Sequence, residues 1–264
     1  MKHFLIQTGE NGQVLHDFSF HLLEAIRFSA WKYRGLVYTH SFAIGGETVP
    51  RLIESGTPKE NIVPIGSLEF VFERMKELGF DDVSKVTPLN VPTVFQQQGF
   101  LQRSYTPRLT KSEINLEFPR FIKSSDVYKG VTEIVESVED LAHISESERF
   151  DVSEVIDIKA EWRVFVQRDE IIGAKSYGSN DWFPEKPNTW LLKEMVSTIE
   201  RARLDGLFFP ASYTLDVGVS LGNTFLIECH PFVSCGLYGF EDMERLPSMM
   251  IQGFDFFKEQ AKNR

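Results

Sequence analysis

Two apolar runs late in the sequence each carry a single carboxylate and are separated by a short polar turn. Residues 213–219 and 224–231 are rich in residues that favour β-strands, and residues 220–223 have the composition of a turn. A loop over residues 221–223 pairs Ser220 with Thr224 and therefore places Asp216 directly opposite Glu228. Like charges that face each other across a ladder are destabilising, so the hairpin predicts a cation between the carboxylates. We expect this cation to be a divalent metal ion.

His230 follows Glu228 by two positions, so both side chains project from the same face of the strand. It is a candidate third metal ligand or phosphate contact, and the alternative interpretation is a core histidine with satisfied hydrogen bonds. Cys229 points to the opposite face, which argues against a nucleophilic role. A zinc cluster with Cys235 is disfavoured, because the spacing differs from that of the usual zinc-binding pairs.

A second hairpin is predicted from residues 161–167 and 171–177. With a loop over residues 168–170, Gln167 lies opposite Ile171 and Arg163 lies opposite Lys175. Two cations that face each other need an anion between them, and a polyphosphate bridged by Mg²⁺ would satisfy both this pair and the carboxylate pair. The alternative is that Glu161 neutralises Arg163 locally and that Lys175 is solvated.

Lys123 ends a predicted strand and precedes a loop over residues 124–130 that contains serine and glycine. A lysine in this position can reach a phosphate while backbone N–H groups of the loop contact others. The loop lacks the glycine density of a Walker motif, and a solvated lysine is the alternative interpretation.

Charge and cysteine content limit the class of protein. The chain has 264 residues, which allows one elaborate domain or two small lobes, and its formal net charge is −10. A negative surface disfavours binding to nucleic acid or to an anionic membrane. No run reaches the roughly 18 apolar residues of a membrane span. Two cysteines are too few for a disulfide framework, so we expect reduced thiols and a cytoplasmic protein.

Apolar periodicity predicts alternating strands and helices in the first third of the chain and several strands in the middle. We expect a helix that begins after Ser67 as its N-cap and ends at Gly79, and a connecting region over residues 82–118 with only short elements. The other predicted helices cover residues 18–33, 137–144, 187–204 and 241–261, and the other predicted strands cover residues 3–7, 36–38, 118–123, 131–135 and 152–158.

In chain order these features are a lysine, a hairpin with a Glu-x-Arg sequence, an aspartate and a Glu-x-His sequence. That order resembles the ATP-grasp superfamily, in particular a compact clade found in bacterial and viral genomes. The resemblance rests on residues 63–70, 121–123, 153–155, 161–165, 215–218, 227–228 and 236–239. It implies an α+β (mixed α/β) ATP-grasp fold, in which a small N-terminal α/β lobe accompanies two α+β subdomains that enclose the nucleotide. We expect the pre-ATP-grasp-like lobe over residues 1–95 and the nucleotide-binding and catalytic region over residues 96–264.

The resemblance also implies cofactors and residue roles. ATP would bind between the lobes with Mg²⁺. The wider family usually continues its acidic strand as Glu-x-Asn, and His230 replaces the Asn here, which makes a different role or metal preference possible. The implied roles are phosphate binding by Lys123 and Lys175, adenine contact by the backbone of Glu154, Val155 and Ile156, catalysis by Arg163, and metal binding by Asp216, Glu228 and His230.

Most ATP-grasp proteins join a carboxylate to an amine or thiol through an acyl phosphate. We therefore expect an ADP-forming carboxylate–amine ligase that acts on small molecules or peptides. The alternatives are a phosphotransferase of the same fold and a non-catalytic nucleotide-binding protein. Arg51, Arg103 and Arg108 are candidates for binding a substrate carboxylate, although each is as well explained as a surface arginine.

Overall fold

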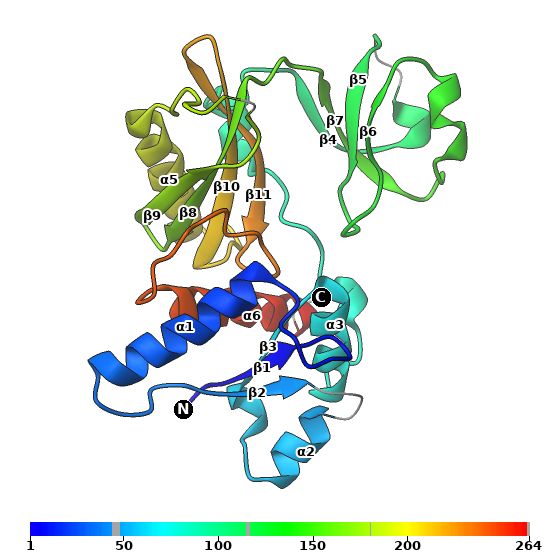
Figure 1. Ribbon diagram of the computed structural model, residues 1–264. Helices are drawn as coiled ribbons and strands as arrows, with labels where there is room; N and C mark the ends of the chain where they lie inside the picture. Colours follow the sequence, from blue (N-terminus) through cyan, green and yellow to red (C-terminus); the bar gives the residue numbers. More distant parts are fainter. Residues whose placement is uncertain (44–47, 115–116, 180, 263–264) are drawn as a thin grey trace.

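The computed structural model describes residues 1–43, 48–114, 117–179 and 181–262, and Figure 1 shows their arrangement. The strands of this described part form three β-sheets, with α-helices beside the first and third sheets. The chain is therefore a mixed α+β protein, as predicted. Among the described helices, none combines the length and the apolar character that a membrane span requires.

The first sheet is parallel, with the order β2-β1-β3, and consists of β1 (His3–Gln7), β2 (Thr39–Ala43) and β3 (Ile62–Ile65). Phe4, Leu5 and Ile6 are fully buried, as expected for a parallel strand that is covered on both faces. Around this sheet lie α1 (Asp17–Lys32), α2 (Thr48–Glu54) and α3 (Leu68–Glu77).

Both predicted ends of α3 are confirmed. The Ser67 side chain accepts a hydrogen bond from the backbone N–H of Phe70 at 3.2 Å, so Ser67 is the N-cap. Gly79 has a φ of 85°, the left-handed conformation that commonly ends a helix. Val71 and Met75 are fully buried and anchor the helix on the first sheet.

The second sheet is antiparallel, with the order β4-β7-β5-β6. Ile122, Phe150 and Val152 form the centre of its small core. Its edge strand β4 falls in the region that we expected to be a connection. Pro107 and a register shift between Thr106 and Leu109 interrupt the alternating pattern that would have indicated a strand. The strands are β4 (Tyr105–Thr110), β5 (Arg120–Ser124), β6 (Thr132–Val135) and β7 (Arg149–Glu154).

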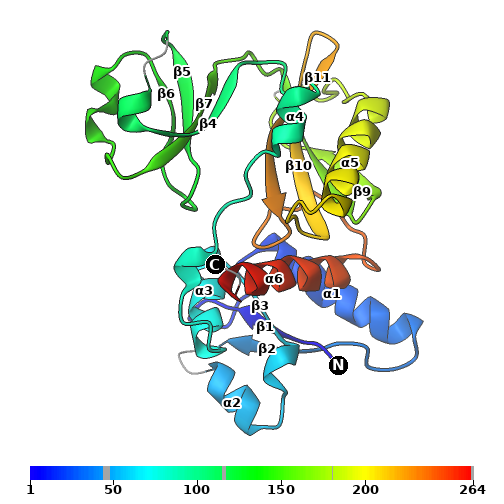
Figure 2. The same ribbon diagram turned by 180° about the vertical axis from the view of Figure 1, so that it is seen from behind.

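The third sheet is also antiparallel, with the order β11-β10-β8-β9. Helices α4 (Thr93–Gln97) and α5 (Thr189–Leu204) lie beside one face of it (Figure 2), where Met195 and Ile199 pack with Val164 and Leu215. The strands are β8 (Ala160–Gln167), β9 (Glu170–Ser176), β10 (Ser212–Ser220) and β11 (Asn223–Pro231).

The last described helix, α6 (Leu246–Lys262), packs with the first sheet and α1 although it comes late in the chain, and we call the first sheet with α1, α2, α3 and α6 the first lobe. Its residues Met249, Phe254 and Phe257 are buried in the same cluster as Phe4 and Leu22. In Figure 2 the helix lies between the first sheet and the third sheet. The predicted division at residue 95 remains a prediction, and α6 connects the two predicted parts across it.

Several predicted element boundaries were wrong. No strand forms over residues 36–38, and the strand that follows them, β2, begins at Thr39. The helix expected at residues 137–144 is a short 3₁₀ helix over Glu139–His143. The strand expected at residues 152–158 is β7, which ends at Glu154. The helix expected from residue 241 begins at Leu246, because Asp242 accepts backbone hydrogen bonds from Glu244 and Arg245 in a preceding turn.

Gly253 lies where α6 crosses the end of β11. A Cβ atom at this position would overlap the backbone carbonyl of Phe232, which cannot move aside as a flexible side chain could. We expect Gly253→Ala to lower the free energy of unfolding by about 1–3 kcal/mol through overpacking, despite the better helix propensity of alanine. Urea denaturation measures this, with Glu259→Ala at an exposed position of the same helix as the control. Equal stability of the two variants would contradict the packing argument.

Candidate functional site

Four charged residues form one row across the third sheet. Glu228 on β11 lies opposite Asp216 on β10, Asp216 opposite Arg163 on β8, and Arg163 opposite Lys175 on β9. The two predicted cross-strand pairs are confirmed. The row contains two adjacent anions followed by two adjacent cations, so unlike charges meet only at its centre.

The turns that were expected to set these pairs were wrong. Ser220 pairs with Asn223 and Gln167 pairs with Glu170, so both hairpins have two-residue turns. A register shift between Asp216 and Val217, and another in β8, then displaces each ladder by one residue. One bulge therefore restores in each hairpin the pairing that a three-residue loop would have given.

The central pair of the row is a buried, bidentate ion pair. Arg163 Nε donates to Asp216 Oδ1 at 2.8 Å, and Arg163 Nη2 donates to Asp216 Oδ2 at 2.7 Å. Asp216 is 1% exposed and Arg163 is 7% exposed. Burial raises the pKa of Asp216, but the hydrogen bonds and charge of Arg163 outweigh it, and the resulting pKa is about 2. Asp216 is therefore the carboxylate that neutralises Arg163.

Asp216, Glu228 and His230 are close enough to share one metal ion. Their candidate ligand atoms all lie within 4.8 Å of one another. His230 Nε2 lies 2.7 Å from Glu228 Oε1 and 3.5 Å from Asp216 Oδ2, yet it is buried and has no hydrogen-bond partner among the described residues. Burial lowers the pKa of His230, although its contact with Asp216 acts in the opposite direction. A neutral imidazole nitrogen beside two carboxylates is a donor set that fits a divalent cation.

Lys123 brings a cation to this group from the facing sheet. It lies in β5 of the second sheet, and its Nζ forms an ion pair with Glu228 of the third sheet. Burial lowers the pKa of Lys123, against the opposing charges of Asp216 and Asp151. The ion pair joins the two sheets across the space between them.

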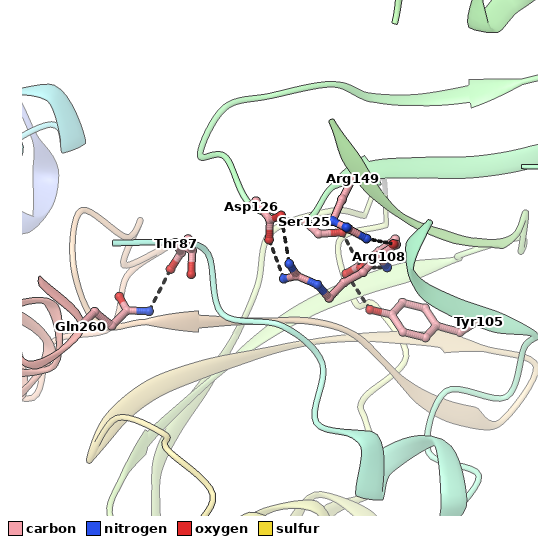
Figure 3. Close-up of polar contacts among 8 residues, drawn as sticks. Thr87, Tyr105, Arg108, Ser125, Asp126, Arg149 and Gln260 are labelled. Atoms are coloured by element: carbon pink, nitrogen blue, oxygen red, sulfur yellow. Dashed lines mark hydrogen bonds and ion pairs between the residues drawn. The ribbon is translucent and has the colours of Figure 1, made fainter. Parts of the chain in front are cut away.

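The loop after Lys123 is held in place by its neighbours. Ser125 Oγ and the Tyr105 hydroxyl both donate to Asp151, at 2.7 Å and 2.6 Å. Figure 3 shows these contacts together with Arg108, which donates to both oxygens of Asp126. Arg108 is therefore occupied by the loop itself, which argues against its expected role in binding a substrate carboxylate.

The same region of the loop is also tied to the first lobe. Lys129 Nζ lies 2.6 Å from Glu69 Oε1 on α3. The carbonyl of Thr87 accepts hydrogen bonds from the Tyr128 hydroxyl and from Gln260 Nε2 of α6, and Figure 3 shows the contact with Gln260. A Cβ atom at residue 130 would overlap Ser124 Oγ, so only glycine fits the end of this loop.

A cavity of about 770 Å³ opens between the second and third sheets, a size typical of ligand sites. Lys175 and Asp216 are not among the residues that line it in the described part of the chain. Asp216 lies beneath the surface of the site, and Lys175 is on the outer strand of the row. The predicted site residues that line the cavity are Lys123, Glu154, Val155, Ile156, Arg163, Glu228 and His230.

Sequence reasoning missed other residues of the site. Tyr177 and Tyr238 both lie close to Arg163. Tyr177 could have been found, because it follows Lys175 by two positions and so shares its face of the strand.

The other two arginines that were candidates for binding a substrate carboxylate are Arg103 and Arg51. Arg103 lines the cavity, but it donates to the carbonyls of Leu101, Leu226 and Ile227, so it supports β11. Arg51 is exposed on α2.

Residues 100–246 match the family described as ATP-grasp domain, R2K clade family 2. This match covers more than half of the chain and contains all the predicted catalytic, nucleotide-binding and metal-binding residues. No protein with a curated description matches the sequence.

Solved structures show the same fold over nearly the whole chain. D-alanine–D-alanine ligase from Bacillus anthracis aligns with a TM-score of 0.55 at 14% identity, covering 97% of this chain and 98% of that one. N5-carboxyaminoimidazole synthetase from Staphylococcus aureus aligns with a TM-score of 0.54 at 14% identity, covering 96% and 77%. The ATP-grasp ligase PsnB, in complex with a minimal precursor, aligns with a TM-score of 0.50 at 14% identity, covering 96% and 99%.

Proposed function

Because the chain belongs to the R2K clade of ATP-grasp proteins, family 2, we propose that it is an ATP- and Mg²⁺-dependent ligase that joins a carboxylate to an amine and forms ADP. The observation that carries the proposal is the convergence of Lys123, Arg163, Glu228 and His230 on one cavity, with Asp216 close to Glu228 and His230. Cations on one side and metal-binding groups on the other are what a polyphosphate and its metal ion require.

Asp216, Glu228 and His230 would hold the metal ion. When bound, a divalent ion supplies neutralisation of negative charge on the phosphate oxygens. Asp216 has both oxygens engaged by Arg163, but each carboxylate oxygen keeps a second lone pair. Lys123 contacts Glu228 now, and we propose that it turns to a phosphate when nucleotide binds. Lys175 would add positive charge from the outer end of the row.

Arg163 is proposed as the catalytic residue. A guanidinium has five N–H bonds, and within the described residues Arg163 uses three of them, two for Asp216 and one for the Gly236 carbonyl at 3.2 Å. Because Arg163 also lines the cavity, the remaining N–H bonds can bind the phosphoryl group that is transferred or the acyl phosphate that results. In this role Arg163 acts by positioning and charge neutralisation, and the reaction needs no protein nucleophile.

The adenine ring is proposed to lie against the backbone of Glu154, Val155 and Ile156, between β7 and β8. The Glu154 side chain accepts a hydrogen bond from the backbone N–H of Ser104 at 2.9 Å, which fixes the start of this segment. Val155 and Ile156 line the cavity beside Ile134 and Ile158, so this end is apolar and suits an aromatic base.

The proposed substrates are carboxylates and amines of small molecules or peptides. The fold is shared with a D-alanine–D-alanine ligase and with a ligase in complex with a precursor peptide, which supports this range. A cytoplasmic location is part of the proposal, because both cysteines are free thiols.

Thermal unfolding with ATP or ADP, each with and without Mg²⁺, tests the proposal. We expect nucleotide to raise the unfolding temperature and Mg²⁺ to increase that shift, because a ligand that binds only the folded state stabilises it by mass action. Amines and carboxylates are then screened for release of inorganic phosphate. Phosphate retained on the product would indicate a phosphotransferase instead, and the lack of any shift at millimolar nucleotide would contradict nucleotide binding.

A further inference from the structure

A guanidinium group and two tyrosine rings meet at the edge of the cavity. The Cζ atom of Arg163 lies 5.6 Å from the ring centre of Tyr177 and 5.1 Å from that of Tyr238. The two rings stack on each other, with centres 4.7 Å apart and planes inclined by 16°. Arg163 lies in β8, Tyr177 follows β9, and Tyr238 lies between β11 and α6, so only the tertiary fold brings them together.

The backbone around Tyr238 is shaped to present its ring. Tyr238 has a φ of 48°, a left-handed conformation that is strained for a non-glycine residue. A Cβ atom at Gly236 would come within 3.0 Å of Cζ of the Tyr238 ring, so the absence of a side chain there leaves room for the ring. The carbonyl of Gly236 also accepts from Arg163. Strained residues of this kind concentrate at functional sites.

The segment that carries Tyr238 is fixed from both sides. Ser234 Oγ donates to the carbonyl of Gly66 in the first lobe at 2.6 Å, just before the N-cap of α3. The Phe240 ring stacks on Phe165 of β8, with centres 4.3 Å apart. The position of the Tyr238 ring is therefore set by both the first lobe and the third sheet.

We propose that Tyr238 and Tyr177 are positioning residues for Arg163, a role that rests on the proposed function. Asp216 and Gly236 fix three N–H bonds of the guanidinium, and the ring faces hold the remaining edge by cation–π attraction. The group is then already oriented when a phosphoryl group arrives, which avoids reorganisation during transfer. The phenol oxygens are not required for this role, because the attraction involves the ring face.

A purely structural role predicts a different outcome. Tyr238 is 44% exposed and borders the cavity, so loss of its ring removes little buried apolar surface. Replacement by leucine should therefore leave the unfolding temperature of the free protein nearly unchanged. A tyrosine that served only as packing would show its effect in that temperature.

The experiment compares the affinity of two probes, Mg-ADP and Mg-ADP with aluminium fluoride, by isothermal titration calorimetry. The fluoride complex imitates the transferring phosphoryl group, so it reports interactions that strengthen in the transition state. We expect Tyr238→Leu and Tyr177→Leu to weaken binding of the fluoride complex by about tenfold, with little change for Mg-ADP alone. Tyr238→Phe and Tyr177→Phe should retain the affinity of the unaltered protein. Gly236→Ala, which displaces the ring without removing it, should act like Tyr238→Leu.

Trp190→Leu is the control, because Trp190 is a 69% exposed aromatic residue of α5 outside the cavity lining. Equal affinity of the leucine variants and the unaltered protein for the fluoride complex would overturn the positioning role. Equal weakening of both probes together with a lower unfolding temperature would also overturn it, in favour of packing. Failure of the unaltered protein to bind Mg-ADP would instead overturn the proposed function, and the inference with it.

Discussion

Replacing Asp216 by alanine is expected to lower the free energy of unfolding by about 3–5 kcal/mol, because it leaves the guanidinium of Arg163 buried without its counter-ion. Arg163 is 7% exposed and donates both of its charge-assisted hydrogen bonds to this one carboxylate. Urea denaturation of the ligand-free protein measures the effect. Glu170→Ala is the matched control, since Glu170 pairs with Arg245 at the exposed edge of the same sheet and should cost less than about 1 kcal/mol.

A double variant separates the loss of the pair from the loss of one partner. Arg163→Met combined with Asp216→Leu removes both charges, and we expect it to be less destabilised than Asp216→Ala alone, because no unpaired charge remains buried. The same instability in the double variant would show that the cost arises from packing around the site. In that case the ion pair of Arg163 and Asp216 would contribute less to stability than its burial indicates.

Glu228→Gln is expected to abolish the extra stabilisation that Mg²⁺ gives to the ADP complex while leaving the ligand-free protein nearly as stable as before. The amide keeps the size of the side chain but removes the charge that the metal ion requires. A ligand at a hundred times its dissociation constant stabilises a protein by about 2.7 kcal/mol, so the loss is readily measured by thermal unfolding. Glu228 is only partly buried, and its partner Lys123 remains accessible to water.

The control for Glu228→Gln is the same substitution at a carboxylate outside the site. Glu170→Gln changes the same type of group on the same sheet and should keep the full Mg²⁺ effect. If Glu228→Gln also retained that effect, the proposal that Asp216, Glu228 and His230 form a metal site would be wrong.

Local pairing could be predicted from the sequence, and the details of the turns could not. The patterns around Asp216 and Arg163 identified both hairpins and the residues that face each other in them. The turn after Ser220 contains Leu221 at φ 51° and Gly222 at φ 81°, a two-residue conformation that suits twisted strands. The compensating bulge beside Asp216 leaves no clear mark in an apolar, β-prone run.

Contacts between segments that lie far apart in the sequence could not be predicted from local patterns. Pairing of β8 with β10 brings Arg163 opposite Asp216, and no pattern within either hairpin predicts it. Without that pairing, the sequence predicts an external partner for each repelling pair, whereas in the fold Arg163 and Asp216 neutralise each other. The position of Lys123 next to Glu228 likewise depends on how two sheets face each other.

The place of α6 in the first lobe has a consequence for how the protein is made. Residues 3–7 and 62–65 leave the ribosome early, but Met249, Phe254 and Phe257, which complete their hydrophobic cluster, leave it much later. Until then the early strands expose apolar surface that α6 will later cover, and transiently exposed surface of this kind favours aggregation and chaperone binding. The core around the first sheet is therefore complete only after residues 246–262 have left the ribosome.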